Sequence, residues 1–301
     1  KTKLSPPCDA CRNCPHSSGR SSATRTCATS PHKHTSVDLL SIALVTPVVV
    51  EQVGCTGVGS NVQAVVFDFF GTLTPGVTAT SQETAHRRVA ACLGLAEAAY
   101  LRAVAASWPQ RCTGALGDIA ETLRWLAREC GGHPDEDAVS TACQIRRDAM
   151  RDQARLRPEA ADVCGELVRR GLRLGLMSDC THELPEIWPS LPVAPYFDAV
   201  VFSVEAGVRK PDPAMYTLAC EGLGVEPAEC LYVGDGGGNE LTGATAMGMR
   251  AVQLAAPDNA GAFVHDREQG WRGAAVTGLR AVPSLLGPRR SVGVEPIEVD
   301  E

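Results

Sequence analysis

Residues 63–74 read QAVVFDFFGTLT and decide the fold of this chain. The apolar run over residues 64–67 is mostly β-branched and aromatic, which is typical of a strand buried on both faces of a parallel sheet. Asp68 follows directly, so we expect its carboxylate at the carboxyl end of the strand, where open α/β sheets hold their ligands. Gly71 and Thr72 then permit a tight turn that offers N–H groups and a hydroxyl to an anion. For this motif alone, the alternative is an aspartate that caps a loop.

Three further segments bring polar side chains to the ends of predicted strands. Residues 172–178, LRLGLMS, end in a serine hydroxyl. Lys210, in the segment VRKPDP, comes shortly after a strand predicted over residues 199–203. Residues 230–235, CLYVGD, end in a second aspartate, and a glycine loop that opens a helix follows. We therefore expect two carboxylates, a hydroxyl and an ammonium group to meet around one anionic group.

This order of side chains resembles the four motifs of the haloacid dehalogenase superfamily, and the resemblance covers roughly residues 62–286. It implies that Asp68 is a nucleophile that attacks phosphorus or carbon and forms a covalent aspartyl intermediate. It also implies that the Ser178 hydroxyl binds an oxygen of the transferring group, while Lys210 neutralises the charge of that group and holds Asp68. Thr72, in the turn after the nucleophile, is a further substrate-binding candidate.

The resemblance further implies a Mg²⁺ site built from Asp68, Asp235 and the backbone carbonyl of Phe70, with Glu240 in the place of a further family carboxylate. The charges predict a cation independently. Three carboxylates on adjacent strand ends raise one another's pKa unless a cation is present, and Lys210 supplies only one positive charge. Mg²⁺ held by one or two carboxylates and a substrate phosphate is the expected form. A network of structural ion pairs is the alternative.

Phe70 departs from the phosphatases of this family, which carry a second aspartate there as general acid and base. Its loss is expected to slow turnover by about 10² to 10⁴, unless a good leaving group or another base, such as Glu205, compensates. An aromatic residue at this position resembles the metal-free dehalogenases of the family. Asp179 argues against a dehalogenase. Those enzymes generally place an asparagine at this position to hold the departing halide, and a carboxylate would repel the halide. They also lack the Gly-Asp pair that residues 234–235 retain.

We therefore expect a Mg²⁺-dependent phosphatase that acts on a small phosphorylated metabolite. The alternatives are a metal-free 2-haloacid dehalogenase and a non-catalytic protein of this fold that binds a phosphorylated ligand. The residues expected to bind substrate are Thr72, Ser178, Asp179 and Arg111. The oligomeric state and the identity of the substrate are not encoded in any of these motifs.

Between residues 76 and 156 the apolar period changes to about 3.6, which predicts helices. Thr80 and Glu83 are spaced as a capping box for the first helix. Inward positions are predicted at residues 85, 89, 93 and 96, at 119, 123 and 126, and at 139, 143 and 150. Such an insert after the first core strand looks like the cap of the haloacid dehalogenase family. We expect Arg111, in the interrupting segment WPQRCTG, to contact a distal polar group of the substrate; a surface arginine is the alternative.

After residue 156 strands and helices alternate, which implies a parallel sheet with right-handed crossovers. We therefore predict an α/β fold with a Rossmann-like core over residues 61–75 and 157–287. An all-helical cap is inserted over residues 76–156. Residues 1–60 are predicted to be a leader outside the core, and residues 288–301 a solvated tail.

The composition limits the partners and the compartment. After residue 60 the chain has 22 basic and 32 acidic residues, which argues against a nucleic-acid surface. No run of 18 apolar residues occurs, so no membrane span is predicted. Five of the 13 cysteines precede the first strand, and three of them, Cys8, Cys11 and Cys14, could bind zinc, although no second pair of ligands is evident. The other eight are scattered in apolar settings, which is typical of buried, reduced thiols in a cytoplasmic protein.

Overall fold

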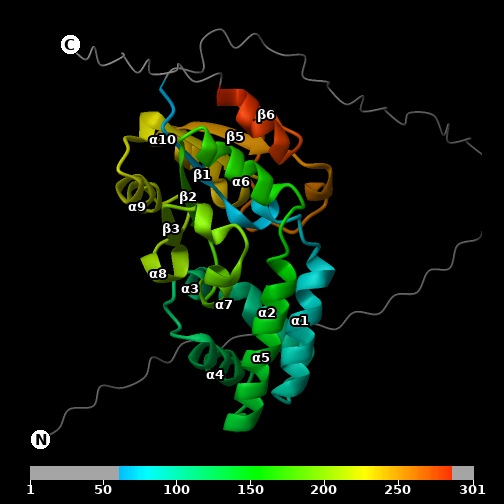
Figure 1. Cartoon of the computed structure of the whole chain (residues 1–301). Coiled ribbons are helices and arrows are strands. Elements are labelled where there is room, and N and C mark those ends of the chain that lie inside the picture. The colour runs from blue at the N-terminus through cyan, green and yellow to red at the C-terminus, as the bar shows by residue number, and fades with distance from the viewer. Residues whose placement is uncertain (1–60, 287–301) are drawn as a thin grey trace, which may run out of the picture. The chain divides into compact units, whose positions relative to one another are not determined.

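The computed structural model describes residues 61–286; the predicted leader, with its cysteine motif, and the predicted tail lie outside the described residues. Within this range six parallel strands form one sheet in the order β3-β2-β1-β4-β5-β6 (Figure 1). The strands are β1 (Ala64–Phe67), β2 (Arg173–Ser178), β3 (Ala199–Phe202), β4 (Cys230–Gly234), β5 (Arg250–Leu254) and β6 (Ala274–Val276). The predicted parallel α/β sheet is therefore confirmed.

The central strand β1 is completely buried because helices cover both faces of the sheet. Val65 and Phe67 belong to the apolar cluster that includes α6 (Ala160–Arg169) and the 3-10 segment Leu279–Leu286. Ala64 and Val66 belong to the cluster on the other face, with α9 (Pro213–Leu223) and α10 (Glu240–Ala246). This double burial explains why the strand reads as an uninterrupted apolar run.

Between β1 and β2 the described chain is helical. The helices are α1 (Ala79–Cys92), α2 (Glu97–Ala106), α3 (Trp108–Cys112), α4 (Ile119–Glu129) and α5 (Glu136–Gln153). Four of them, α1, α2, α4 and α5, pack together around an apolar cluster of their own (Figure 1). Two short helices, α7 (Glu183–Ile187) and α8 (Ser203–Ala206), follow β2 and β3, and α7 contacts α5 while α8 contacts α3.

Most of the inward positions predicted for these helices are buried, but three details are wrong. Thr78, rather than Thr80, caps α1, because its side chain accepts a hydrogen bond from the N–H of Ser81 (3.3 Å). Ala96 is exposed, because α1 ends before it. The segment 108–114, predicted to interrupt the helices, contains the short helix α3.

No helix within residues 61–286 has the length and apolar character needed to cross a membrane. The eight cysteines of this range are all free thiols, and each is buried or half-buried. Six of them are buried, which agrees with the prediction that these cysteines lie in apolar surroundings.

Candidate active site

The site lies where neighbouring parallel strands end. Phe67, the last residue of β1, pairs with Leu176 of β2 on one side and with Val233 of β4 on the other. Asp68 comes directly after β1, Ser178 ends β2, and Asp235 comes directly after β4. The shared register therefore brings these three residues to one edge of the sheet, as the sequence predicted.

Lys210 connects the carboxylates of this edge. Its side chain is 3% exposed, and its ammonium group donates to Asp68 Oδ1 (2.6 Å) and Glu240 Oε2 (2.5 Å). Burial alone would lower the pKa of Lys210, but the Asp68 and Glu240 carboxylates raise it well above its ordinary value. Every other basic side chain among residues 61–286, histidines apart, is an arginine. Lysine is a compact point charge, and at this position it reaches two carboxylates at once.

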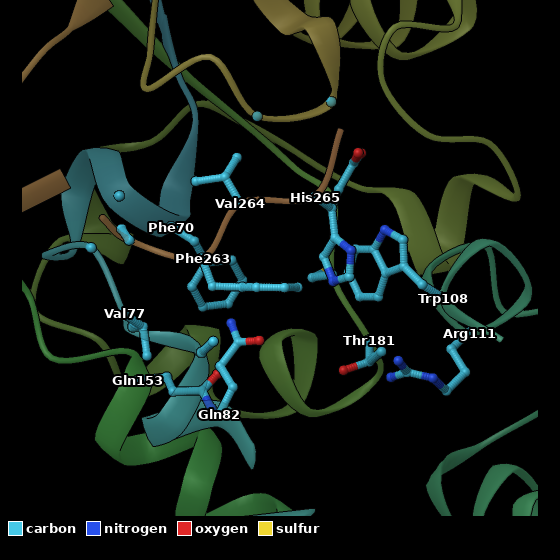
Figure 2. A pocket seen from close by; sticks show the side chains of 18 of the residues that line it. Phe70, Val77, Gln82, Trp108, Arg111, Gln153, Thr181, Phe263, Val264 and His265 are labelled. Atoms are coloured by element: carbon cyan, nitrogen blue, oxygen red, sulfur yellow. The ribbon is translucent and has the colours of Figure 1, made fainter. Parts of the chain in front are cut away.

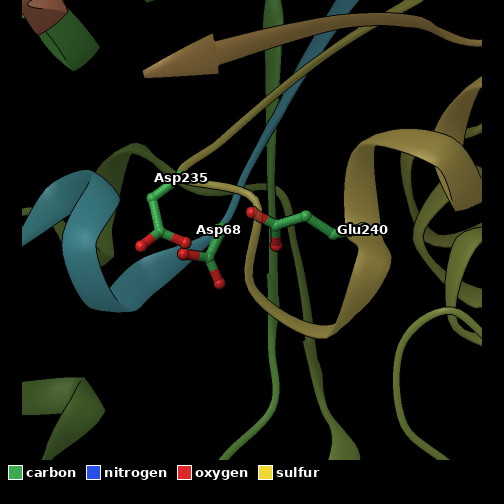
Figure 3. A group of neighbouring side chains, drawn as sticks. All are labelled: Asp68, Asp235 and Glu240. Atoms are coloured by element: carbon green, nitrogen blue, oxygen red, sulfur yellow. The ribbon is translucent and has the colours of Figure 1, made fainter. Parts of the chain in front are cut away.

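Three buried carboxylates form a group that could hold a cation. Ligand atoms of Asp68, Asp235 and Glu240 all lie within 4.8 Å of one another, and Figure 3 shows the three side chains converging. Burial and the Glu240 charge raise the pKa of Asp68 well above its usual range, which Lys210 offsets only in part. The same two causes raise the pKa of Asp235 to about 6. The group therefore carries more negative charge than Lys210 balances, as the sequence predicted.

The hydrogen bonds distinguish the roles of the three carboxylates. Glu240 Oε1 accepts from the N–H of Gly236 (2.9 Å), and its Oε2 accepts from Tyr232 Oη (2.8 Å) as well as from Lys210. By contrast, the Oδ2 atoms of Asp68 and Asp235 accept no hydrogen bond from the described residues. These two oxygens thus have no protein partner among the described residues, whereas both oxygens of Glu240 do.

The turn after Asp68 depends on a glycine. Gly71 has φ +77°, and a Cβ there would lie 2.6 Å from Asp235 Oδ2. Arg157, which is buried, donates to the carbonyl oxygens of Gly71 (3.1 Å) and Thr72 (2.9 Å), and Asn259 donates to the Gly71 carbonyl as well (2.8 Å). Neither Arg157 nor Asn259 was predicted to belong to the site.

Two buried hydroxyls of this edge have no protein partner. Thr72 Oγ1 and Ser178 Oγ form no hydrogen bond within the described part of the chain, and both residues are 0% exposed. Buried hydroxyls are normally hydrogen-bonded, so unpartnered ones indicate a ligand or a water molecule. Each of the two hydroxyls can still donate a hydrogen bond, which is consistent with the anion-binding role predicted for Thr72 and Ser178.

A pocket of about 380 Å³ opens onto this group. It is lined from the sheet edge by Asp68, Phe70, Asp179, Lys210 and Asp235, but not by Thr72, Ser178 or Glu240. The helices between β1 and β2 contribute the opposite wall, including Gln82, His86, Trp108, Arg111, Arg146 and Gln153, while residues 262–265 close one side. Figure 2 shows Phe70 and Val77 at one end of this pocket, with Arg111 and Thr181 at the other.

The remaining predicted residues divide between the pocket and the surface. Arg111 is buried on α3 and lines the pocket, so the alternative of a surface arginine is wrong. Asp179 also lines it, and its Oδ1 accepts from the backbone N–H of Lys210 (3.0 Å). Burial raises the pKa of Asp179, although Lys210 opposes this shift. Glu205, considered as a substitute base, is exposed on α8 and does not line the pocket.

Known proteins resemble this chain in sequence. A family model described as haloacid dehalogenase-like hydrolase matches residues 62–248. The chain is 32% identical over 168 residues to the phosphoserine phosphatase of Thermus thermophilus, and the match covers 52% of this chain and 66% of that protein. It is 31% identical over 130 residues to the glyceraldehyde 3-phosphate phosphatase of Methanopyrus kandleri, and this match covers 43% of this chain and 56% of that protein. It is 27% identical over 221 residues to the phosphoglycolate phosphatase of Shigella dysenteriae, and this match covers 64% of this chain and 81% of that protein. The chain thus spans less than two thirds of the length of the first two relatives.

Solved structures resemble it in fold. The L-2-haloacid dehalogenase of Xanthobacter autotrophicus superposes with a TM-score of 0.51 at 25% identity, over 75% of this chain and 98% of that one. The 2-haloacid dehalogenase of Pseudomonas syringae pv. Tomato superposes with a TM-score of 0.54 at 21% identity, with the same coverage. The second likeness concerns the fold alone.

Proposed function

Because the chain belongs to the haloacid dehalogenase-like hydrolases, we propose that it hydrolyses small phosphate monoesters with Asp68 as the nucleophile and Mg²⁺ as the cofactor. The observation that carries this proposal is the buried contact between Lys210 and Asp68 Oδ1 in a residue that lines the pocket, because it leaves Asp68 Oδ2 without a protein partner. Two unpartnered hydroxyls, on Thr72 and Ser178, lie at the same edge of the sheet. Together these groups supply a nucleophile, a positive charge and spare donors for one phosphoryl group.

The proposed reaction has two steps. In the first, Asp68 Oδ2 bonds to phosphorus while the ester P–O bond breaks, and the leaving alkoxide takes up a proton from water. In the second, water attacks phosphorus, which releases inorganic phosphate and restores the Asp68 carboxylate. Lys210 and the Thr72 and Ser178 hydroxyls bind the phosphoryl oxygens in both steps and stabilise their developing charge.

The residues present fit a Mg²⁺ ion. Asp235 Oδ2 accepts no hydrogen bond from the described residues, and Asp68 offers the carboxylate oxygen that does not attack phosphorus. Mg²⁺ commonly takes one or two carboxylates, so Asp68 and Asp235 are proposed as its ligands. The backbone carbonyl of Phe70 is the third proposed ligand. Glu240, first expected as a ligand, is proposed to act mainly by holding Lys210 in place. When bound, the ion would neutralise charge on the transferring phosphoryl group.

Phe70 restricts the substrates that such an enzyme can use. The ring lines the pocket and packs edge-on against Phe69, with 5.0 Å between the ring centroids. It has no proton to give to the leaving group or to take from water. We therefore propose that esters whose alcohols leave readily are hydrolysed faster than other esters, and that release of phosphate from Asp68 is slow.

The helices over residues 76–156 are proposed to act as a cap that selects the substrate. They supply much of the pocket wall, including Arg111 and Trp108, and Arg111 is proposed to contact the distal group of the substrate. Asp179, on the opposite wall, is proposed to hydrogen-bond a polar group of the leaving alcohol.

A 2-haloacid dehalogenase is the second candidate, because Phe70 places an aromatic ring beside the nucleophile. In that reaction Asp68 would attack carbon and displace a halide ion. The half-buried Asp179 carboxylate disfavours it, since a negative charge in the pocket would repel the departing halide.

Phosphate release separates the two candidates. A panel of phosphate monoesters, beginning with phosphoserine, phosphoglycolate and glyceraldehyde 3-phosphate, is assayed with Mg²⁺ and with EDTA. We expect activity only with Mg²⁺ and none in Asp68→Asn. Chloride release from 2-chloropropionate that persists in EDTA would instead establish the dehalogenase.

A further inference from the structure

A small recess lies within the helical insert, next to the main pocket. Its volume is about 20 Å³, and it shares four lining residues with that pocket, namely His86, Arg111, Arg146 and Thr181. Tyr100, His182 and the buried Glu183 also line it, as do apolar side chains of α4, and the Glu183 carboxylate is paired with Arg146. Because the walls are shared, the recess adjoins the end of the pocket where Figure 2 shows Arg111 and Thr181.

Arg111 brings an unbalanced positive charge to this recess. Arg111 is 7% exposed, and within residues 61–286 it donates only to Ser107 Oγ (3.1 Å) and to the carbonyl oxygen of Val104 (2.9 Å). Its guanidinium also lies over the Trp108 ring, 5.5 Å from the ring centroid. No carboxylate oxygen of residues 61–286 lies within 4.0 Å of its guanidinium, whereas the neighbouring Arg146 pairs with Glu183 at 2.7 Å. Buried arginines are rarely left without an anion, because an unpaired buried charge is costly.

Two further donors in the recess lack a partner. Tyr100 is 0% exposed, and its hydroxyl forms no hydrogen bond within the described residues. Arg146 Nη1 lies 3.4 Å from His86 Nε2. Because a guanidinium can only donate, Nε2 accepts, and the neutral imidazole carries its proton on Nδ1. Burial, together with Arg146 and Arg111, lowers the pKa of His86, so the ring is neutral at neutral pH. That Nδ1–H is buried and unpartnered too.

We propose that this recess binds a small anionic group, and that the anion is the distal carboxylate of a phosphate ester whose phosphoryl end lies at Asp68. Arg111 supplies the charge, and the Tyr100 hydroxyl and His86 Nδ1–H supply hydrogen bonds. The assignment to a substrate rests on the proposed phosphatase function. It restricts the substrate class to phosphate esters that carry a second negative charge.

The charge of Arg111 favours an anion over water in the recess. A water molecule needs about 10–15 Å³ of such space, so the recess has room for the head of one small group. Water can accept hydrogen bonds from two donors, but it leaves the charge of Arg111 unbalanced. A carboxylate accepts from all three donors and balances this charge.

The first test measures anion binding without catalysis. The full chain is titrated with acetate, and with acetamide as a neutral molecule of similar shape, at constant ionic strength and without metal or phosphate. We expect acetate, but not acetamide, to raise the melting temperature. Tyr100→Phe should weaken the affinity for acetate about tenfold or more, since it removes a hydrogen bond to a charged group. Tyr196→Phe is the matched control, because Tyr196 lines neither the pocket nor the recess.

Arg111→Lys provides a second variant that keeps the charge but not the geometry of the guanidinium. We expect it to retain part of the acetate affinity, and Arg111→Gln to lose it. Acetate binding that is absent in the wild type, or unchanged in Tyr100→Phe and Arg111→Gln, would overturn the assignment of the recess. The acetate affinities do not depend on whether the protein hydrolyses any ester.

The second test concerns the substrate. Phosphate monoesters of ω-hydroxy acids with two to six carbons are compared with alkyl phosphates of the same length, in Mg²⁺. We expect one carboxylated ester to exceed its alkyl partner in kcat/KM, and Tyr100→Phe to reduce this preference about tenfold. If alkyl phosphates are hydrolysed equally well, the substrate assignment fails while the phosphatase function stands. A second result would also overturn the substrate assignment: chloride competes with acetate for the recess, and the enzyme shows no preference for carboxylated esters. That result would identify the recess as a halide site.

Discussion

Lys210→Met should lower the free energy of unfolding by about 3–5 kcal/mol, because it leaves buried carboxylates without a positive partner. The ammonium group donates to Asp68 and to Glu240 at 2.6 and 2.5 Å, and the Asp68 and Glu240 side chains are 6% and 0% exposed. Without it, these charges have no positive side chain within ion-pair distance among the described residues. For a domain of this size the loss corresponds to a drop in melting temperature of about 6–20 °C.

The assay is urea unfolding at neutral pH in EDTA, so that no metal replaces the lost charge. Arg209→Met is the control, because Arg209 is adjacent in sequence and its pair with Asp266 is partly exposed; it should cost less than about 1 kcal/mol. Lys210→Met/Glu240→Gln also removes one of the unpaired carboxylate charges. We therefore expect the double variant to lose about 1–3 kcal/mol less than the sum of the losses in the two single variants. A loss below about 1 kcal/mol in Lys210→Met, or strict additivity, would refute the view that one ammonium balances these carboxylates.

Three other predictions concern single positions. Phe70→Asp should raise kcat for phosphate esters by about 10² to 10⁴, because it restores an acid–base group, while Phe70→Asn should not; equal rates in the two variants would contradict this. Gly71→Ala should abolish Mg²⁺-dependent activity, because its Cβ would lie 2.6 Å from Asp235 Oδ2, whereas Gly248→Ala, which has a similar positive φ but open space, should lose only stability. Burial lowers the pKa of His265 to about 4, so the unfolded chain binds the extra proton and stability falls as the pH drops from about 6.5 to 4. We expect His265→Phe to remove about 1–2 kcal/mol of this loss in urea unfolding, after allowance for partial exposure; an unchanged pH slope would show that the histidine does not titrate as inferred.

The parts of the fold that could be predicted have strong local signals. The strand β1 and the position of Asp68 follow from one apolar run and the residue after it. Strand β4 ends directly before Asp235, as predicted, because Gly234 marks its end. Strand β6 was missed, since its three residues, AAV, show neither alternation nor a long apolar run.

The supporting contacts of the site could not be predicted, because they join segments far apart in sequence. Arg157 and Asn259 fix the Gly71 turn from 86 and 188 residues away, and neither belongs to a recognisable motif. The sequence predicts Glu240 as a further carboxylate of a metal site, but only the structure shows that Lys210 and Tyr232 both donate to its Oε2. The donors without a partner beside Arg111, on His86 and Tyr100, likewise could not be predicted, because they come together only when α1, α2 and α3 pack against one another.

The most direct test of the aspartyl mechanism is to trap the intermediate. Wild-type protein is mixed with a reactive phosphate ester and Mg²⁺, quenched in acid during turnover, and digested for mass spectrometry. Because Phe70 leaves the second step without a general base, we expect the intermediate to accumulate, with one phosphoryl group on the peptide that contains Asp68 and none in Asp68→Asn or in EDTA. Phosphate release by the wild type without any phosphorylated Asp68 peptide, or at an undiminished rate in Asp68→Asn, would contradict the assignment of Asp68 as the nucleophile.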